Sequence, residues 1–149
     1  MHKVMSRCSI SSMLLFLAYW PSPAGACEWR FLCFFDFGGI QLSTRCQAII
    51  AEAVQQWENL RDGRRGACET PRQRITAKLE VVGNAWEYDR PAANQALSER
   101  RAEAVAAALR SLGATQVYSH GVGDRSPFVP NGGRAEPQNR FAEIIFHLP

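Results

Sequence analysis

Arg101 is the residue whose type and position most clearly point to chemistry. It lies four positions after Leu97 and four positions before Val105, at the edge of the apolar stripe of a predicted helix. A guanidinium at such a position needs an acceptor, because a buried charge without a partner is costly. Two interpretations are open. The side chain either extends along the helix to put its head in water, which is the commoner arrangement, or it holds an anion at the floor of a cleft.

Catalytic chemistry has no comparable signal in the sequence. His120 and His147 are the only histidines after residue 26. The alternation of the last predicted strand turns His147 away from the core, and His120 falls in a glycine-rich predicted loop. No G-x-S-x-G or H-E-x-x-H motif is present, and the cysteines lack the C-x-x-C spacing of metal sites. We therefore expect neither an enzyme nor a bound metal or cofactor.

The helix that carries Arg101 is predicted over residues 94–112. This stretch is rich in alanine, and leucine, glutamate and arginine fill most of the other positions, which favours a helix. Asn94 is the predicted N-cap, and Gly113 suits the left-handed position that follows a helix. The apolar stripe is predicted to consist of Leu97, Ala104, Val105, Ala108 and Leu112.

The first 26 residues have the pattern of a signal peptide. Lys3 and Arg7 give a basic start, residues 13–20 form an apolar core, and residues 24–26 read Ala-Gly-Ala, an A-x-A cleavage site. The apolar run is shorter than the roughly 20 residues of a transmembrane helix. We expect export to the periplasm, with possible association with the outer membrane. The same cut would expose Cys27, where a bacterial lipoprotein is acylated, although Ala24 stands where such signals usually have leucine.

Residues 27–149 are expected to form a single domain with one modest core. Loss of Lys3 and Arg7 with the signal peptide lowers the formal net charge from +3 to +1. This balance does not indicate nucleic acid or an anionic membrane surface as a partner. The only predicted contact with a membrane is a lipid on Cys27.

Four cysteines remain after cleavage: Cys27, Cys33, Cys46 and Cys68. An even number in an oxidising compartment indicates two disulfides, with three possible connectivities. The side chains at 31, 33, 35 and 37 share one face of an extended strand, and a predicted helix packs Cys46 against that face. We therefore favour Cys33–Cys46 and Cys27–Cys68, with buried free thiols as the alternative. An acyl group on Cys27 would exclude this pairing.

The remaining elements alternate along the chain. A strand near residues 31–37 precedes a helix whose capping box is predicted at Thr44 and Gln47, and this helix buries residues 46, 49, 50, 53 and 57. A long basic loop over residues 61–74 leads to a half-buried strand at 75–83. Further strands are predicted at 116–119 and 143–148, separated by a loop at 120–134. This order predicts an α+β two-layer βαβαββ sandwich, with two main helices on one face of a four-stranded mixed sheet.

Three motifs resemble the C-terminal domain family of outer membrane protein A, which includes the peptidoglycan-associated lipoprotein. They are Phe-Asp-Phe at residues 35–37, N-x-x-L-S-x-x-R-A beginning at Asn94, and E-P-Q-N-R at residues 136–140. They occur in the family's order, and the resemblance runs from about Phe34 to Phe146. It implies the same two-layer fold.

The resemblance also implies a ligand, the diaminopimelate in the stem peptide of peptidoglycan. Its far end carries one ammonium and one carboxylate, so the family recognises it with an aspartate and an arginine. The family's arginine falls on Arg101, and matching positions along the implied cleft are Asp36, Asn94, Asn139 and Arg140.

The family's aspartate is Trp86 in this sequence. Tryptophan has one N–H donor and no acceptor, so it can offer an ammonium only a cation–π face. Gly38 and Asn84 also depart from the pattern, where the family has a second acid and a histidine or tyrosine. Glu87 and Asp89 lie in the same predicted loop and are candidates for the missing carboxylate.

Two functions are therefore predicted. The first is a periplasm-facing domain that binds peptidoglycan non-covalently, with Arg101 taking the stem carboxylate. The second is a domain that keeps the scaffold without the ligand and serves as a structural or protein-interaction module of the envelope. Trp86 favours the second, because an exposed tryptophan is a frequent interface anchor.

Overall fold

The computed structural model of the chain describes residues 30–64, 74–86, 90–130 and 136–149. The predicted signal peptide (1–26), Cys27, Cys68 and the loop carboxylates Glu87 and Asp89 lie outside these residues. The predictions that depend on them stay predictions.

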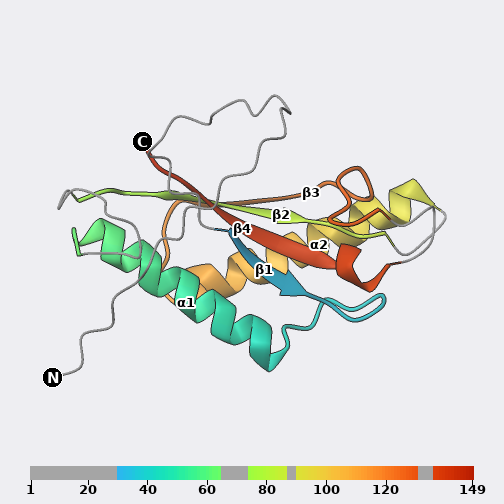
Figure 1. Ribbon diagram of the computed structural model, residues 1–149, viewed down its shortest axis with the longest axis horizontal. Coiled ribbons are helices and arrows are strands. Elements are labelled where there is room, and N and C mark those ends of the chain that lie inside the picture. Colours follow the sequence, from blue (N-terminus) through green and yellow to red (C-terminus); the bar gives the residue numbers. More distant parts are fainter. Residues whose placement is uncertain (1–29, 65–73, 87–89, 131–135) are drawn as a thin grey trace, which may run out of the picture.

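Four strands form one mixed sheet in the order β1-β4-β2-β3 (Figure 1). The strands are β1 (Arg30–Phe34), β2 (Lys78–Gly83), β3 (Val117–Gly121) and β4 (Phe141–His147). β4 pairs antiparallel with both β1 and β2, whereas β2 and β3 are parallel and therefore need a crossover. The helix α2 (Pro91–Ser111) is that crossover.

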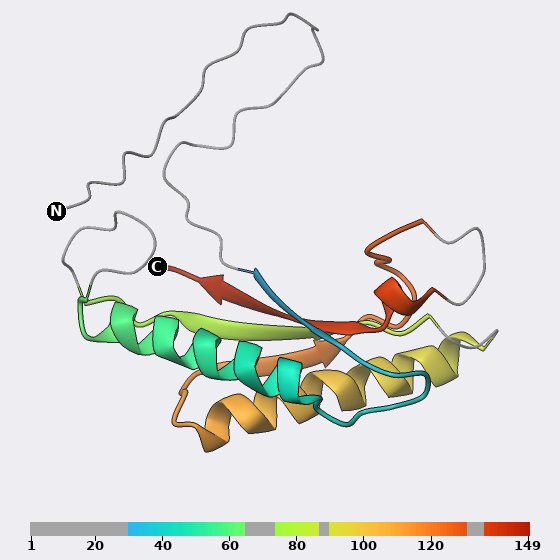
Figure 2. The same cartoon turned by 60° about the horizontal axis from the view of Figure 1, so that its bottom comes forward.

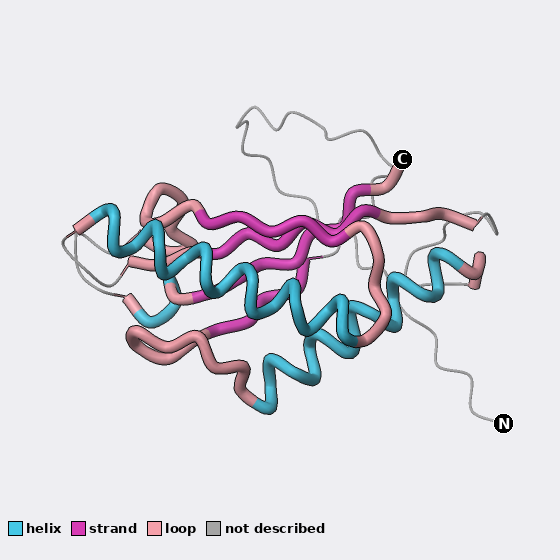
Figure 3. The backbone as a smooth tube through the Cα atoms, turned by 180° about the vertical axis from the view of Figure 1, so that it is seen from behind, coloured by secondary structure: helices cyan, strands magenta, loops and turns pink. Residues whose placement is uncertain are grey.

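The other long helix, α1 (Thr44–Arg61), connects β1 to β2, and a short 3₁₀ helix, η1 (Pro137–Asn139), precedes β4. Both long helices lie on the same side of the sheet (Figures 2 and 3). α2 contacts β2 and β3, while α1 contacts β1. This arrangement confirms the α+β two-layer prediction. No helix in the described residues is long and apolar enough to span a membrane.

The core lies between the two layers. Alternate residues of β2 and β4 point into it, and both helices pack apolar residues against the sheet side of the core, with Leu60 as the last buried residue of α1. Trp57 is 2% exposed, and its indole N–H donates to the carbonyl of Ala77 at 3.1 Å. The buried ring therefore loses no hydrogen bond on folding. The residues that fill this core include Ile50, Ala53, Leu79, Val81, Leu97, Val105, Leu109, Ile144 and Phe146.

α2 begins three residues before its predicted start, so Asn94 is not its N-cap. Arg90 occupies the cap position without a side-chain hydrogen bond, and Pro91 is the first helical residue. Proline is well suited there, because its fixed φ is helical and the N–H that it lacks would have no helical partner. Gly113, with φ +97°, takes the predicted left-handed position after the helix.

The apolar stripe of α2 is also rotated from the predicted one. The buried face consists of Asn94, Leu97, Ser98, Arg101, Ala102, Val105, Ala106 and Leu109. Leu112 is 50% exposed. Arg101 thus lies in the middle of the buried face and not at its edge.

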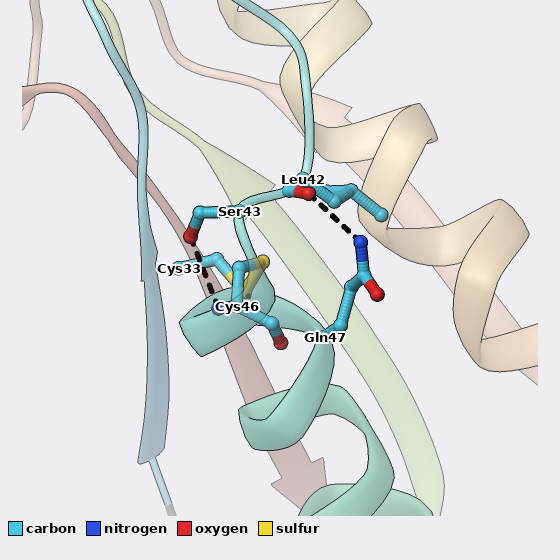
Figure 4. Close-up of a disulfide and its surroundings, with 5 residues drawn as sticks. All are labelled: Cys33, Leu42, Ser43, Cys46 and Gln47. Carbon is cyan, nitrogen blue, oxygen red and sulfur yellow. Dashed lines mark hydrogen bonds between the residues drawn. A yellow bond between two sulfur atoms is a disulfide. The ribbon is translucent and has the colours of Figure 1, made fainter.

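The start of α1 corrects a second cap. Ser43, not Thr44, is the N-cap, and its hydroxyl accepts a hydrogen bond from the N–H of Cys46 at 3.2 Å (Figure 4). Gln47 turns back and donates to the carbonyl of Leu42 at 3.0 Å. The predicted box was therefore one residue out of register.

A disulfide joins Cys33 in β1 to Cys46 in the first turn of α1 (Figure 4). Their exposed fractions are 0% and 2%, so the bond is part of the core. This half of the predicted connectivity is confirmed. The bond closes the loop between β1 and α1, which supplies most of the contacts of Arg101 described below.

α2 lies very close to the sheet at Ser98. A Cβ at Gly83 of β2 would lie 1.9 Å from the backbone oxygen of Ser98, and one at Gly121 of β3 would lie 2.2 Å from its Oγ. Neither position has room for a side chain. Glycine in both strands is therefore what allows the helix to seat at this depth.

β3 extends beyond the predicted strand and includes His120, so the prediction that His120 lies in a loop is wrong. His120 and His147 lie on either side of Glu80 on the sheet face away from the helices. The His147 Nε2 to Glu80 Oε2 distance is 2.6 Å, and the His120 Nδ1 to Glu80 Oε1 distance is 3.5 Å. Glu80 thus connects the two neighbouring strands across the exposed face.

Candidate ligand-binding site around Arg101

The Arg101 side chain is completely buried and bonded to three backbone carbonyls. Its Nε donates to Gly39 at 3.0 Å, Nη1 to Asn84 at 3.2 Å and Nη2 to Asp36 at 3.0 Å. The side chain therefore does not extend to water, and its exposed fraction of 0% means that it does not lie open at a cleft floor either. It ties the turn after β1 to the end of β2.

The ring of Phe35 completes this environment. The guanidinium carbon lies 5.1 Å from the ring centroid, and Phe35 is 6% exposed. A desolvated cation–π contact of this kind contributes on the order of 2 kcal/mol, which offsets part of the cost of burying the charge. The dipoles of the three backbone carbonyls stabilise the buried charge further.

Glycine makes the carbonyls of the turn converge on Arg101. Gly39 donates its N–H to the carbonyl of Asp36 at 2.9 Å, which closes a four-residue turn, and Gly38 has φ +64° at its third position. A positive φ there is the geometry that favours glycine. The departure of Gly38 from the family pattern thus has a structural reason.

Asp36 contributes its backbone to Arg101 and leaves its side chain exposed. The predicted site residue is therefore next to Arg101, with its carboxylate directed to solvent.

Asn84 departs from the family pattern in sequence, and in the structure it is central to the site. Its carbonyl accepts from Arg101, and its Nδ2 donates to the carbonyl of Ser126. Its Oδ1 is buried and has no hydrogen-bond partner among the described residues. The side chain therefore joins the end of β2 to the loop after β3 and keeps one buried acceptor unused.

Asn94 and Asn139 are buried and bonded within the chain. Asn94 Nδ2 donates to Asp124 Oδ2 at 3.2 Å. The Asn139 side chain forms two hydrogen bonds with the backbone of Val129. Its Nδ2 donates to the Val129 carbonyl at 2.8 Å, and its Oδ1 accepts from the Val129 N–H at 2.9 Å. Both ends of the Asn139 amide are thus used to hold the loop that precedes η1.

Arg140 is half-buried at the start of β4. Its guanidinium carbon lies 6.0 Å from the ring centroid of Phe37, a residue that is 57% exposed. No carboxylate of the described residues forms an ion pair with it, and its Nε is buried without a partner among those residues.

Trp86 is half-buried just beyond the end of β2. The residue before it, Ala85, donates its N–H to the carbonyl of Gly123 at 2.9 Å, which places the loop after β3 alongside. Asp124, the next residue of that loop, was missed by sequence reasoning. Nothing in the local sequence singles it out, and only its bond to Asn94 brings it into the site.

No family model matches the sequence. An outer membrane protein of Gluconacetobacter diazotrophicus is 34% identical over 136 residues, covering 85% of this chain. The chain spans 31% of the length of that relative.

Two solved structures share the fold. The peptidoglycan-associated lipoprotein of Burkholderia pseudomallei matches 78% of this chain and 90% of its own, with a TM-score of 0.61 and 23% identity. The OmpA-like domain of FopA1 from Francisella tularensis matches 82% of this chain and 76% of its own, with a TM-score of 0.62 and 18% identity.

Proposed function

The chain is an OmpA-like domain in its fold, and on that premise we propose that it associates non-covalently with peptidoglycan in the bacterial envelope. The observation that carries the proposal is the match to the peptidoglycan-associated lipoprotein, which extends over 90% of that chain. The similarity to an outer membrane protein agrees with a location facing the periplasm. Residues 1–26 act as the export signal in this proposal.

The ligand we propose is the diaminopimelate of the stem peptide. Its carboxylate is held at Arg101, and its ammonium is taken by the exposed carboxylate of Asp36 in place of the missing aspartate. The ring of Trp86 adds a cation–π face of about 0.5–2 kcal/mol. Asn94 and Asn139 support this position from within, since both are buried and bonded to the neighbouring loops, and Arg140 is half-buried beside them.

The burial of Arg101 sets a condition on this assignment. Because the guanidinium is 0% exposed, a ligand carboxylate can replace the carbonyls of Asp36 and Gly39 only if the turn at residues 36–39 moves away. Binding at Arg101 therefore entails a change in this turn.

The same burial favours a second function, an envelope module that binds a protein or has a structural role without a peptidoglycan ligand. In that function Arg101 has only a structural role, because it bonds the turn at residues 36–39 to the end of β2, and Trp86 contacts the partner protein. Replacing the family's aspartate with an indole removes the charge that recognises an ammonium. The two functions differ in their dependence on peptidoglycan.

Co-sedimentation of residues 27–149 with diaminopimelate-type sacculi tests the proposal. We expect the wild type to sediment and a folded Arg101→Lys variant to bind less, because the ammonium group of lysine cannot form the planar, bidentate hydrogen bonds that a guanidinium gives a carboxylate. Arg100→Lys is the matched control, since Arg100 is the exposed neighbour on α2. Thermal unfolding of each variant separates lost binding from lost folding.

The outcomes distinguish the functions. Wild-type protein that stays in solution while Trp86→Asp sediments would favour the module without a ligand. If neither protein sediments, peptidoglycan association is wrong. Mass spectrometry of the mature N-terminus, with non-reduced peptide mapping, tests both the lipid on Cys27 and its proposed bond to Cys68.

A further inference from the structure

A second, more open site lies at the beginning of α2. It is a cavity of about 300 Å³ between the first turns of α2 and the loop that follows β3. The start of α2 and the loop after β3 lie at the same end of the ribbon in Figure 1. That volume is at the lower end of the range for small-molecule sites, so it suits a ligand of a few heavy atoms or the end group of a longer one. The lining residues are Pro91, Ala92, Gln95, Val122, Gly123, Asp124 and Arg125.

The cavity is lined by one acidic and one basic side chain, Asp124 and Arg125, and hydrogen bonds within the chain fix the position of each. Asp124 is half-buried, and its Oδ2 accepts from Nδ2 of Asn94 at 3.2 Å. The Arg125 Nε donates to the carbonyl of Val122 at 3.0 Å, and its Nη2 donates to Oε1 of Gln95 at 3.2 Å. Each of these hydrogen bonds lowers the entropy that the side chain would lose on binding a ligand.

The two charges are adjacent in sequence but form no ion pair with each other or with any other described side chain. One oxygen of Asp124 and the Nη1 group of Arg125 have no hydrogen-bond partner among the described residues. Arg101, in contrast, is fully buried under the turn at residues 36–39. The opposed charges that a zwitterion requires are therefore present and reachable at this cavity.

We infer that the cavity binds the zwitterionic end of an amino acid, with its ammonium on Asp124 and its carboxylate on Arg125. Asp124 then supplies the carboxylate that Trp86 does not, and the ligand need not displace the turn that covers Arg101. This placement replaces Arg101 and Asp36 as the residues that hold the two charges of the ligand, and it leaves the proposed association with peptidoglycan unchanged. The inference rests on the proposed function for the source of the zwitterion, the diaminopimelate of the stem peptide. The cavity and its charges are independent of that source.

Two measurements on residues 27–149 test the inference. In the first, meso-diaminopimelate is titrated into ¹⁵N-labelled protein, and backbone amide shifts are expected at residues 92–95 and 122–125. In the second, co-sedimentation with sacculi is repeated for Asp124→Asn and Arg125→Gln. Each substitution removes a hydrogen bond to a charged group, so each should weaken binding about tenfold or more. Glu52→Gln and Arg100→Gln remove the same charges from exposed positions elsewhere and should bind as the wild type does.

The results separate the inference from the proposed function. If the wild type and both site variants sediment equally, the inference is wrong and the proposed function stands. If sacculi are not bound but diaminopimelate shifts the amides named above, the proposed function is wrong and the cavity assignment stands. If the titration leaves those amides unchanged, the cavity assignment is overturned.

Discussion

Removing the Cys33–Cys46 disulfide should destabilise the domain by about 3 kcal/mol. The two cysteines are 13 residues apart in sequence. In the chain-entropy description of a cross-link, closing a loop of about that length in the unfolded state costs about 3 kcal/mol at 25 °C. The Cys33→Ala, Cys46→Ala double variant loses this contribution. It also loses the packing of two buried sulfur atoms.

Urea unfolding followed by tryptophan fluorescence can separate the two contributions. The difference in unfolding free energy between the wild type and the double variant is measured without and with a strong reductant. With reductant the unfolded wild type is no longer cross-linked, so the difference that remains reports packing alone. Effects on the other cysteines cancel, because both proteins contain them. The oxidised difference should exceed the reduced difference by about 3 kcal/mol.

The prediction has a functional side as well. The loop that the disulfide closes contains Asp36 and Gly39, whose carbonyls hold Arg101. Loss of the cross-link should therefore broaden or shift the amide signals of residues 36–39 in the folded protein. Equal oxidised and reduced differences, with an unchanged spectrum of the turn, would refute the argument that the cross-link orders the site.

Three further predictions concern single side chains. Ser43→Ala removes the N-cap of α1 and should lower the unfolding free energy by about 1 kcal/mol in the same urea assay. Gly121→Ala forces a methyl group against Ser98 and should cost about 3 kcal/mol; a loss below 0.5 kcal/mol would contradict the close packing. Glu103 accepts a 2.7 Å hydrogen bond from Ser119, which is the main reason why its pKa is lowered. A lowered folded-state pKa stabilises at neutral pH, and this contribution is lost as the pH falls through that pKa, so the small deficit of Glu103→Gln at pH 7 should shrink towards pH 3.

The sequence was informative wherever a side chain's own pattern determined its environment. The alternation around Leu79 and Val81 predicted a half-buried strand, and the pairing of Cys33 with Cys46 followed from the face that each occupies. Gly113 ended α2 as expected, because a positive φ there favours glycine.

The environment of Arg101 could not be predicted in the same way. Its acceptors are backbone carbonyls 62, 17 and 65 positions away, and a backbone carbonyl has no signature in the sequence. The sequence showed that a partner was needed, but not that the partner would be the chain itself. Asn94 was misread for a related reason. Its side chain serves Asp124 across the fold, whereas asparagine near a helix start ordinarily serves as a cap.

The glycines beneath Ser98 have a consequence for how this domain can change. A helix rises 1.5 Å per residue, so Arg101 lies about 4.5 Å further along α2 than the point where the helix rests on Gly83 and Gly121. Any side chain at either glycine lifts the helix and withdraws the guanidinium from oxygens that it meets at 3.0–3.2 Å. Gly83 and Gly121, which have no side chain, thus set the distance between α2 and the sheet. That distance determines whether the guanidinium of Arg101 meets its carbonyl acceptors. A substitution at either glycine would disable the cluster around Arg101 while every residue in that cluster keeps its identity.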